Sequence, residues 1–70
     1  MSTNQKYSAR IHSRRQLTSI DNHLKACLGM LNNLGIAYQE ALPQVSEACI
    51  NMITMIDLVK GMAAKVRENL

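Results

Sequence analysis

The chain has 70 residues, of which 47% are hydrophobic and 3% aromatic, with no Trp or Phe and a formal net charge of +3. A chain this short buries only about 60% of its extended surface, so we expect a further source of burial, and oligomerisation fits the residues better than a disulfide or a metal. Its longest apolar run, Cys27 to Leu31, is far shorter than the roughly 20 residues of a membrane-spanning helix, which excludes a span. The polar start at Ser2 to Gln5 lacks the apolar segment of a secretory signal, so we expect an intracellular protein of the cytoplasm or nucleus.

Residues 1–12 are interpreted as a basic N-terminal arm. Residues 1–16 carry a charge of +4, against −1 for the rest of the chain, and the charge comes from Lys6, Arg10, Arg14 and Arg15. Basic or polar residues alternate with less polar ones along this segment, which is the period of a strand. We expect the arm to be flexible and solvated. The alternative is that these four cations contact an anionic partner.

A heptad repeat of apolar residues begins at Leu17 and predicts a helix. One stripe of the repeat contains Leu17, Leu24, Leu31, Tyr38, Val45, Met52, Val59 and Val66, and the companion stripe contains Ile20, Cys27, Leu34, Ala41, Ala48, Met55 and Met62. Ser13 and Gln16 have the spacing of a capping box just before this repeat. The first helix is therefore expected over residues 13–34.

Two breaks follow in the sequence. Gly35 can end a helix in the left-handed conformation, with Ile36 folding back onto the last turn, and Pro43 suits the first turn of a new helix. We therefore expect a connection over residues 35–42 and a second helix over residues 43–69. The predicted fold is all-α: a helical hairpin of two long antiparallel helices that completes a bundle or coiled coil with other chains. The alternative is one long helix kinked at the proline, because the heptad keeps its phase across it.

The second predicted helix is apolar around most of its circumference. A helix of this kind is normally buried on most sides, and one neighbouring helix does not cover it. We therefore expect other protein chains, either copies of this one or different ones, to pack against the hairpin. The predicted partner interface comprises Leu24, Leu28, Leu31, Ile50, Met52, Ile53, Met55, Ile56, Leu58, Val59 and Met62.

The sequence contains no recognisable catalytic or cofactor-binding motif. Its five carboxylates fall mostly on polar helix positions, and its three glycines do not form a phosphate-binding loop. The residues with metal-binding side chains, His12, His23, Cys27 and Cys49, lack the close pairs of a zinc finger. We therefore predict no enzyme activity, no cofactor, no metal site and no small-molecule substrate.

Two functions remain open. The first is a small assembly or adaptor protein that acts through protein–protein interaction as a subunit of an oligomeric complex. The alternative is a dimeric DNA-binding protein that uses its basic arm. In the order of its elements, a basic alternating segment followed by two helices, the chain resembles the ribbon-helix-helix repressors, whose paired strands enter the major groove. That resemblance covers no motif residue, and it implies groove contacts by Lys6, Arg10, His12 and Arg14.

Overall fold

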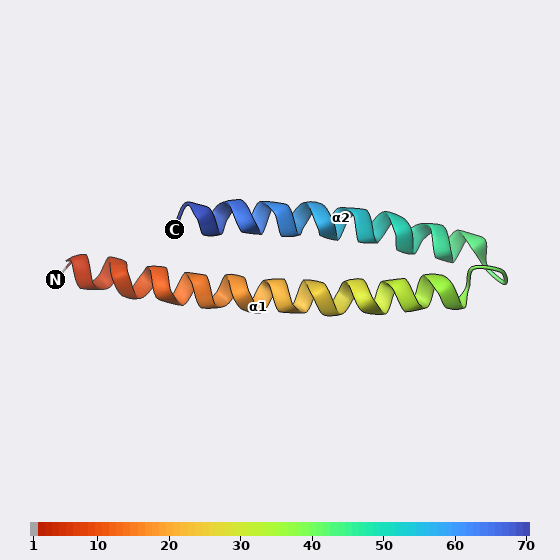
Figure 1. Cartoon of the computed structure of the whole chain (residues 1–70), viewed down its shortest axis with the longest axis horizontal. Helices are drawn as coiled ribbons and strands as arrows, with labels where there is room; N and C mark the ends of the chain where they lie inside the picture. The colour runs from red at the N-terminus through yellow and green to blue at the C-terminus, as the bar shows by residue number, and fades with distance from the viewer. Residues whose placement is uncertain (1) are drawn as a thin grey trace.

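The computed structural model describes the backbone of residues 2–70 and the side chains of residues 8–70. Two helices, α1 (Ser2–Ala37) and α2 (Pro43–Glu68), run antiparallel as a hairpin (Figure 1). The predicted hairpin is thus confirmed, and the single kinked helix is excluded. The Cα atoms extend over 60 × 15 × 11 Å with a radius of gyration of 16.9 Å, whereas a compact domain of this length has about 11 Å. The hairpin is therefore a thin rod.

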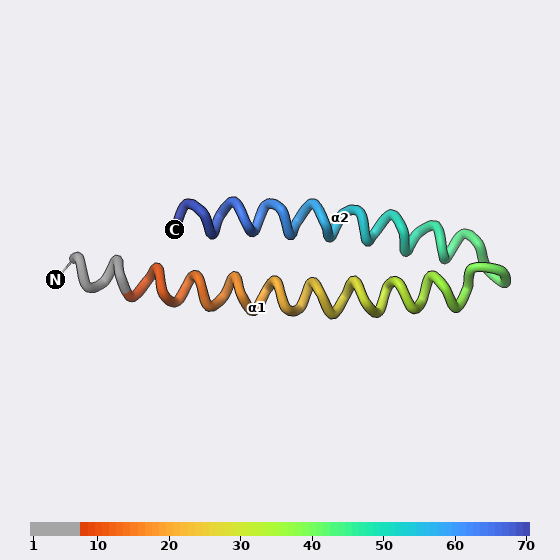
Figure 2. The backbone as a smooth tube through the Cα atoms, viewed as in Figure 1, coloured from red at the N-terminus to blue at the C-terminus, as the bar shows by residue number. Residues whose placement is uncertain are grey.

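Helix α1 begins at Ser2 rather than near residue 13. Residues 2–12, expected as a separate arm, are the first turns of this helix, and the backbone of residues 2–70 contains no strand. The physical reason is that helix propagation adds one backbone hydrogen bond for each residue fixed, and Gln, Lys, Ala and Arg are good helix formers. Ser13 consequently lies inside the helix and is not its cap. The tube in Figure 2 follows α1 past the end of α2.

The connection is shorter than predicted, because α1 continues through Gly35 to Ala37 and no residue of the described backbone has a positive φ. Residues 38–42 form the turn, in which the Leu42 amide donates to the Tyr38 carbonyl at 3.0 Å. The left-handed cap expected at Gly35 is therefore wrong. Ile36 is 62% exposed, so it does not fold back into the hairpin.

Helix α2 starts as predicted, with Pro43 in its first turn, where a missing backbone donor costs nothing. Leu42 precedes it with φ −137° and ψ 77° and makes no side-chain capping bond. The Leu42 carbonyl accepts hydrogen bonds from the Val45 and Ser46 amides, at 2.9 and 3.4 Å. The first-turn amides of Val45 and Ser46 are thus satisfied by the backbone and not by a capping side chain.

The helices are in close contact beside the turn. Gly35 and Cys49 are buried, with Cys49 only 3% exposed, and they are the only buried residues among 8–70. A Cβ at position 35 would lie 3.4 Å from the Cys49 Cβ and 3.8 Å from the Ser46 Oγ, so a glycine in α1 lets α2 come close. Glycine here serves helix packing rather than helix termination.

The opposite end of the interhelical contact is looser and more polar. An open pocket of about 300 Å³ lies between the helices there, lined by Leu17, Asp21, Lys60, Ala63, Ala64, Arg67 and Glu68. The Arg67 guanidinium donates to the Arg14 carbonyl at 3.3 Å and to the Thr18 hydroxyl. These bonds fix the C-terminal end of α2 beside the middle of α1.

Candidate protein-interaction surface

Five of the eleven predicted interface residues lie half-buried along the contact between the two helices, which we call the seam. They are Leu24, Leu28, Leu31, Ile53 and Ile56. On α1 the seam follows the heptad from Leu17, and on α2 it follows Cys49 at spacings of three and four. The structure therefore uses these residues to join the helices of one chain.

The other six predicted interface residues are exposed. Met55 and Met62 expose 65% and 66% of their surface, and Met52 and Val59 expose about half. Ile50 and Leu58 are exposed as well, though they point in other directions, as their helical positions show. Large apolar side chains that remain open over the full length of α2 are not accounted for by packing within one chain.

Most of the exposed apolar residues of the two helices fall on one side of the hairpin. On α1 they lie three positions after seam residues, as Ile20 follows Leu17, and on α2 Met52 follows Cys49 in the same way. Because the helices run in opposite directions, this same rotation from the seam brings both stripes to the same side. We call this side the apolar face and define it by Ile20, Cys27, Met30, Leu34, Met52, Met55, Val59, Met62 and Val66.

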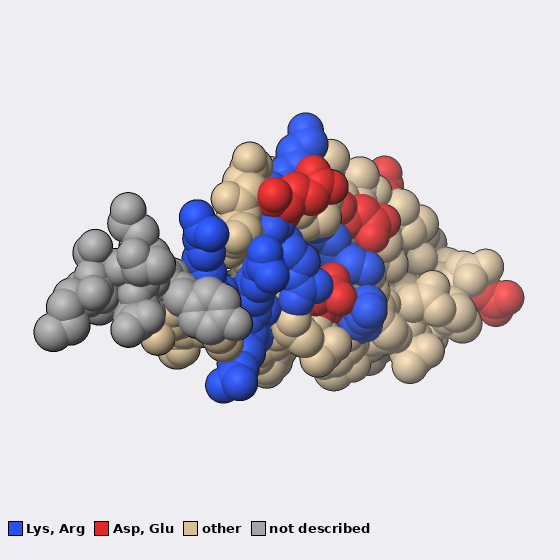
Figure 3. Space-filling model, turned by 60° about the vertical axis from the view of Figure 1, so that its left-hand side comes forward, with Lys and Arg blue, Asp and Glu red and all other residues tan. Residues whose placement is uncertain are grey.

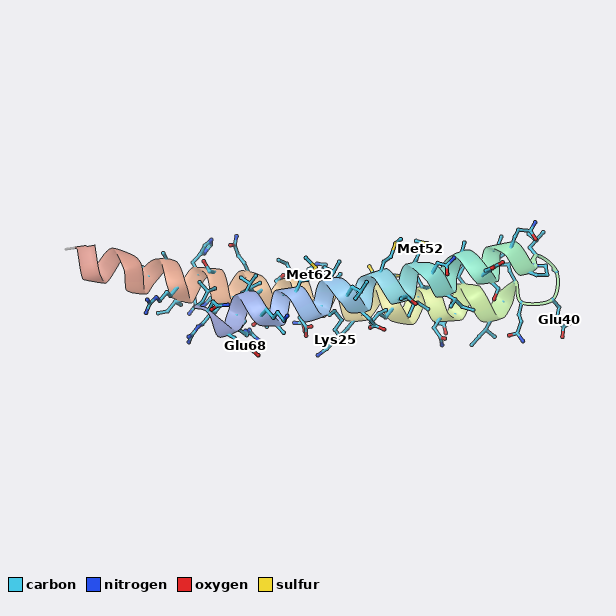
Figure 4. The ribbon with its side chains drawn as sticks, turned by 90° about the horizontal axis from the view of Figure 1, so that it is seen from above. Lys25, Glu40, Met52, Met62 and Glu68 are labelled. Carbon is cyan, nitrogen blue, oxygen red and sulfur yellow. The ribbon has the colours of Figure 1, made fainter. Side chains whose placement is uncertain are left out.

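The opposite side of the hairpin is polar. In the view from above, Met52 and Met62 project from one edge, while Lys25 and Glu68 project from the other (Figure 4). Ile36 and Ile50 are the apolar exceptions there, and they border a small pocket of about 140 Å³ beside the turn. The hairpin is thus amphipathic as a whole, with one face suited to packing and one suited to water.

This two-helix face was not anticipated from the sequence, and four of its nine members, Met52, Met55, Val59 and Met62, are among the predicted interface residues. The heptad repeat places Leu17 and Leu24 in one stripe with Met52 and Val59, yet the first pair lies in the seam and the second pair on the apolar face. Helix α2 is rotated relative to the expected phase, so that Cys49, Ile53 and Ile56 meet α1. The sequence does contain a signal for this face: α2 is apolar around most of its circumference, so one stripe packs against α1 while another remains exposed.

The two ends of the hairpin differ in charge. All eight Lys and Arg residues of the chain lie in residues 1–25 and 60–70, which hold two acidic residues and so carry +6. Residues 26–59, the half around the turn, hold three acidic residues and no basic one, which is −3 and completes the total of +3. Figure 3 shows the described basic side chains gathered toward the end with the termini. Folding brings Lys60, Lys65 and Arg67 to the same end as Arg10, Arg14 and Arg15, whereas Lys6 lies outside the described side chains.

Asp21 is the described residue whose acidity responds to this charge. Its carboxylate accepts a hydrogen bond from the Lys25 ammonium at 3.0 Å, one turn along α1. This bond holds the pKa of Asp21 below its usual value, and the charges of Lys25, Lys60 and Arg67 act in the same direction, while partial desolvation opposes them. The main partner of Asp21 is therefore Lys25 of its own helix, with Lys60 and Arg67 of α2 adding smaller effects.

The metal-binding residue types are dispersed among the described side chains. No three His, Cys, Asp or Glu side chains within residues 8–70 lie close enough together to hold a metal ion. The His23 Nδ1 atom lies 2.6 Å from the Ser19 carbonyl oxygen of its own helix, and both cysteines are free thiols. These residues form no recognisable site.

Within the described part of the chain, neither helix combines the length and the hydrophobicity needed to cross a bilayer. Comparison with known proteins finds no matching family, no matching curated protein and no matching solved structure. The apolar face and the charge distribution therefore carry the functional argument.

Proposed function

We propose that this chain is a small assembly or adaptor protein that acts through protein–protein interaction, as a subunit of a homo- or hetero-oligomeric complex. The observation that carries the proposal is the apolar face, which runs along both helices and which the single hairpin leaves open. Monomeric proteins rarely expose so extended an apolar patch, and such patches mark interaction sites.

The exposed surface of the chain supports the same conclusion. It amounts to 5703 Å², whereas a compact monomer of 7.8 kDa exposes about 4,400 Å². The excess, about 1,300 Å², is comparable to the area that one partner contributes to a stable interface. No side chain among residues 8–70 is fully buried, so packing against another chain would supply the missing core.

The residue types of the face suit a helical partner. Methionine supplies Met30, Met52, Met55 and Met62, and its unbranched side chain adapts to irregular apolar surfaces. An amphipathic helix or helix pair is the partner shape that packs along a face of two parallel ridges. We therefore infer helix-to-helix packing as the mode of interaction.

The basic end favours DNA binding as a second candidate. Folding places Lys60, Lys65 and Arg67 at the same end as Arg10, Arg14 and Arg15, which enlarges the basic cluster expected from the sequence alone. In this second candidate function, helices rather than paired strands contact the DNA phosphates. Fluorescence anisotropy with a labelled DNA duplex at low salt tests it: binding that weakens steeply with salt supports it, and no binding at low salt contradicts it.

The leading proposal is tested by placing a charge on the apolar face. Met55→Asp introduces a carboxylate at a fully accessible position of the face, and Asn33→Asp makes a similar change at an exposed polar position of α1. Ile56 is unsuitable because it lies in the seam, where a charge would damage the hairpin itself. We expect light scattering to give an oligomeric mass for the unmodified chain and for Asn33→Asp, and a lower mass for Met55→Asp. Folded monomers in all three cases would contradict the proposal.

A further inference from the structure

We infer that the apolar face packs against the same face of a second copy of this chain, with the two hairpins antiparallel, so that they form a four-helix bundle. This inference rests on the proposed function and names its partner. Three independent observations carry it: the internal symmetry of the face, the charge difference between the ends of the hairpin, and the area available.

Most of the α1 stripe of the face is symmetric about Cys27; the exception is Met30, whose counterpart at position 24 is the seam residue Leu24. Ile20 precedes it by seven residues and Leu34 follows it by seven, so turning the stripe end for end places each of these two residues where the other was. In an antiparallel two-fold pair, residue i of one copy contacts residue j of the other and the reverse holds as well, so this spacing places Ile20 opposite Leu34 and Cys27 opposite Cys27.

The stripe on α2 has the same symmetry about a matching point. Turned end for end about position 57, Met52 exchanges with Met62 and Met55 exchanges with Val59, while Val66 falls on the position of Ala48, which is outside the face. Contacts between the helices show which residues lie at the same height along the rod. Gly35 lies beside Cys49 and Ser46, and Arg67 bonds Arg14 and Thr18, so the residue numbers of such pairs add to between 81 and 85. Cys27 is therefore level with residues 54–58 of α2, so one two-fold axis serves both helices.

Charge selects the antiparallel arrangement over the parallel one. In an antiparallel pair the +6 end of each hairpin lies over the −3 half of the other. In a parallel pair the two basic ends are stacked about 10 Å apart, which is about one Debye length at 0.1 M salt, so their repulsion is only partly screened. The face itself contains no charged side chain, and its apolar contacts are therefore preserved in either orientation.

The area of the face is sufficient for a stable dimer. The 26 residues of α2 span about 39 Å, and two adjacent helices present a face roughly 20 Å wide. Each copy thus offers roughly 800 Å², which is the usual contribution of one partner to a specific interface.

The orientation is tested with a spin label beside the turn. Glu40→Cys is labelled in a chain carrying Cys27→Ala and Cys49→Ala, after light scattering shows that it keeps the mass of the unmodified protein. Pulsed electron spin resonance is expected to give a distance of about 40 Å between the labels of the two copies, because the turns lie at opposite ends of the bundle. A label at Ala26→Cys, level with the expected two-fold axis, serves as the control and is expected to give about 20 Å or less.

The possible outcomes separate the inference from the proposed function. A distance of about 20 Å at position 40 in a dimer indicates a parallel pair and overturns the inference while leaving an assembly role intact. A monomeric mass overturns the self-pairing, and the proposed function fails with it if that monomer retains full helix content and unfolds cooperatively. A monomer that is poorly folded overturns only the self-pairing.

Charge variants test the same orientation with the natural cysteines retained. Glu47→Lys replaces a negative charge by a positive one in the turn half, and Glu68→Lys makes the same change at the basic end. We expect Glu47→Lys to raise the Kd of the dimer several-fold at low salt, with the difference vanishing near 1 M salt, and Glu68→Lys not to raise it. Equal weakening by the two variants would overturn the antiparallel arrangement.

Discussion

The half of the hairpin beside the turn and the half beside the termini are held together differently. Beside the turn, Gly35 lets α2 approach until Cys49 is almost completely buried. Beside the termini, the helices are separated by an open pocket and are linked by the hydrogen bonds of Arg67 to Arg14 and Thr18. One heptad pattern spans both halves, yet the first is closely packed and the second is open, with hydrogen bonds from Arg67 to α1. A continuous apolar repeat therefore does not imply uniform packing.

This difference assigns distinct roles to the two ends. The close contact beside the turn favours this register of the two helices, because Gly35 leaves room for Cys49 where a Cβ would lie 3.4 Å from it. The polar end holds all the basic residues and is free to meet charges on another molecule. We therefore expect substitutions beside the turn to change hairpin stability and those beside the termini to change mainly charge-dependent behaviour.

The largest effect is expected when the close contact is filled. Gly35→Leu places a large side chain against Cys49 and forces the helices apart, which is expected to lower the free energy of unfolding by about 2 kcal/mol. Gly29→Leu is the control, because nothing lies within 4 Å of a Cβ at that position, and it is expected to raise stability by up to about 1 kcal/mol. Circular dichroism during urea unfolding, at one chain concentration, measures both. Equal effects would mean that the helices are not in close contact at Gly35.

A smaller change in stability, of opposite sign, is expected when a side chain is enlarged at the end of the hairpin beside the termini. Ala63 lines the open pocket beside Leu17, so Ala63→Leu adds apolar contact without a clash and is expected to stabilise the hairpin by about 1 kcal/mol. The same enlargement at the tight end, Cys49→Leu, is expected to destabilise it by about 1 kcal/mol or more. Thermal unfolding of the two variants compares them. If both variants shift the Tm in the same direction, the two halves are packed alike.

The start of α2 offers a further gain of similar or smaller size. Leu42 occupies the N-cap position without a capping side chain, so Leu42→Ser supplies an oxygen to the first turn, where the Gln44 amide has no backbone partner among the described residues, and is expected to add up to about 1 kcal/mol. Leu42→Ala is the matched control, since it removes the same leucine without adding a cap. A Tm for the serine variant no higher than that of the alanine variant would contradict this assignment.

The smallest effect concerns Asp21. Its pKa is lowered in the folded protein, first by the hydrogen bond from Lys25 and then by neighbouring positive charge. Its contribution to stability is therefore present above the unfolded pKa, about 4, and is lost as the pH falls through the lower folded value. Asp21→Asn is expected to lower the Tm slightly at pH 7 and not at all near pH 2. A difference that persists unchanged at acid pH would exclude this cause.

Much of the fold was predictable from local chemistry. Pro43 marks the start of α2 correctly, and the apolar periodicity identifies both helices. The start of α1 was not predictable from Ser13 and Gln16, because a capping-box spacing occurs equally well inside a helix whose earlier residues are good helix formers.

The candidate surface was predictable only in part. Helix α2 carries apolar residues on nearly every side, so several rotational phases satisfy the pattern equally well. The contact of Gly35 with Cys49 selects one of these phases, and such a contact depends on the distance between two backbones rather than on either sequence. That choice moves Ile53 and Ile56 into the seam and leaves Met55 and Met62 on the apolar face.

The central claim is that the hairpin is completed by a second copy of itself, and the dependence of its thermal stability on concentration tests this most directly. A folded dimer that separates into unfolded chains gains about 2.7 kcal/mol for a hundredfold increase in concentration. The Tm of the unmodified chain is therefore expected to rise by several degrees between about 1 and 100 μM. A cooperative transition whose Tm stays constant over this range, from a chain of monomeric mass with full helix content, would contradict the claim.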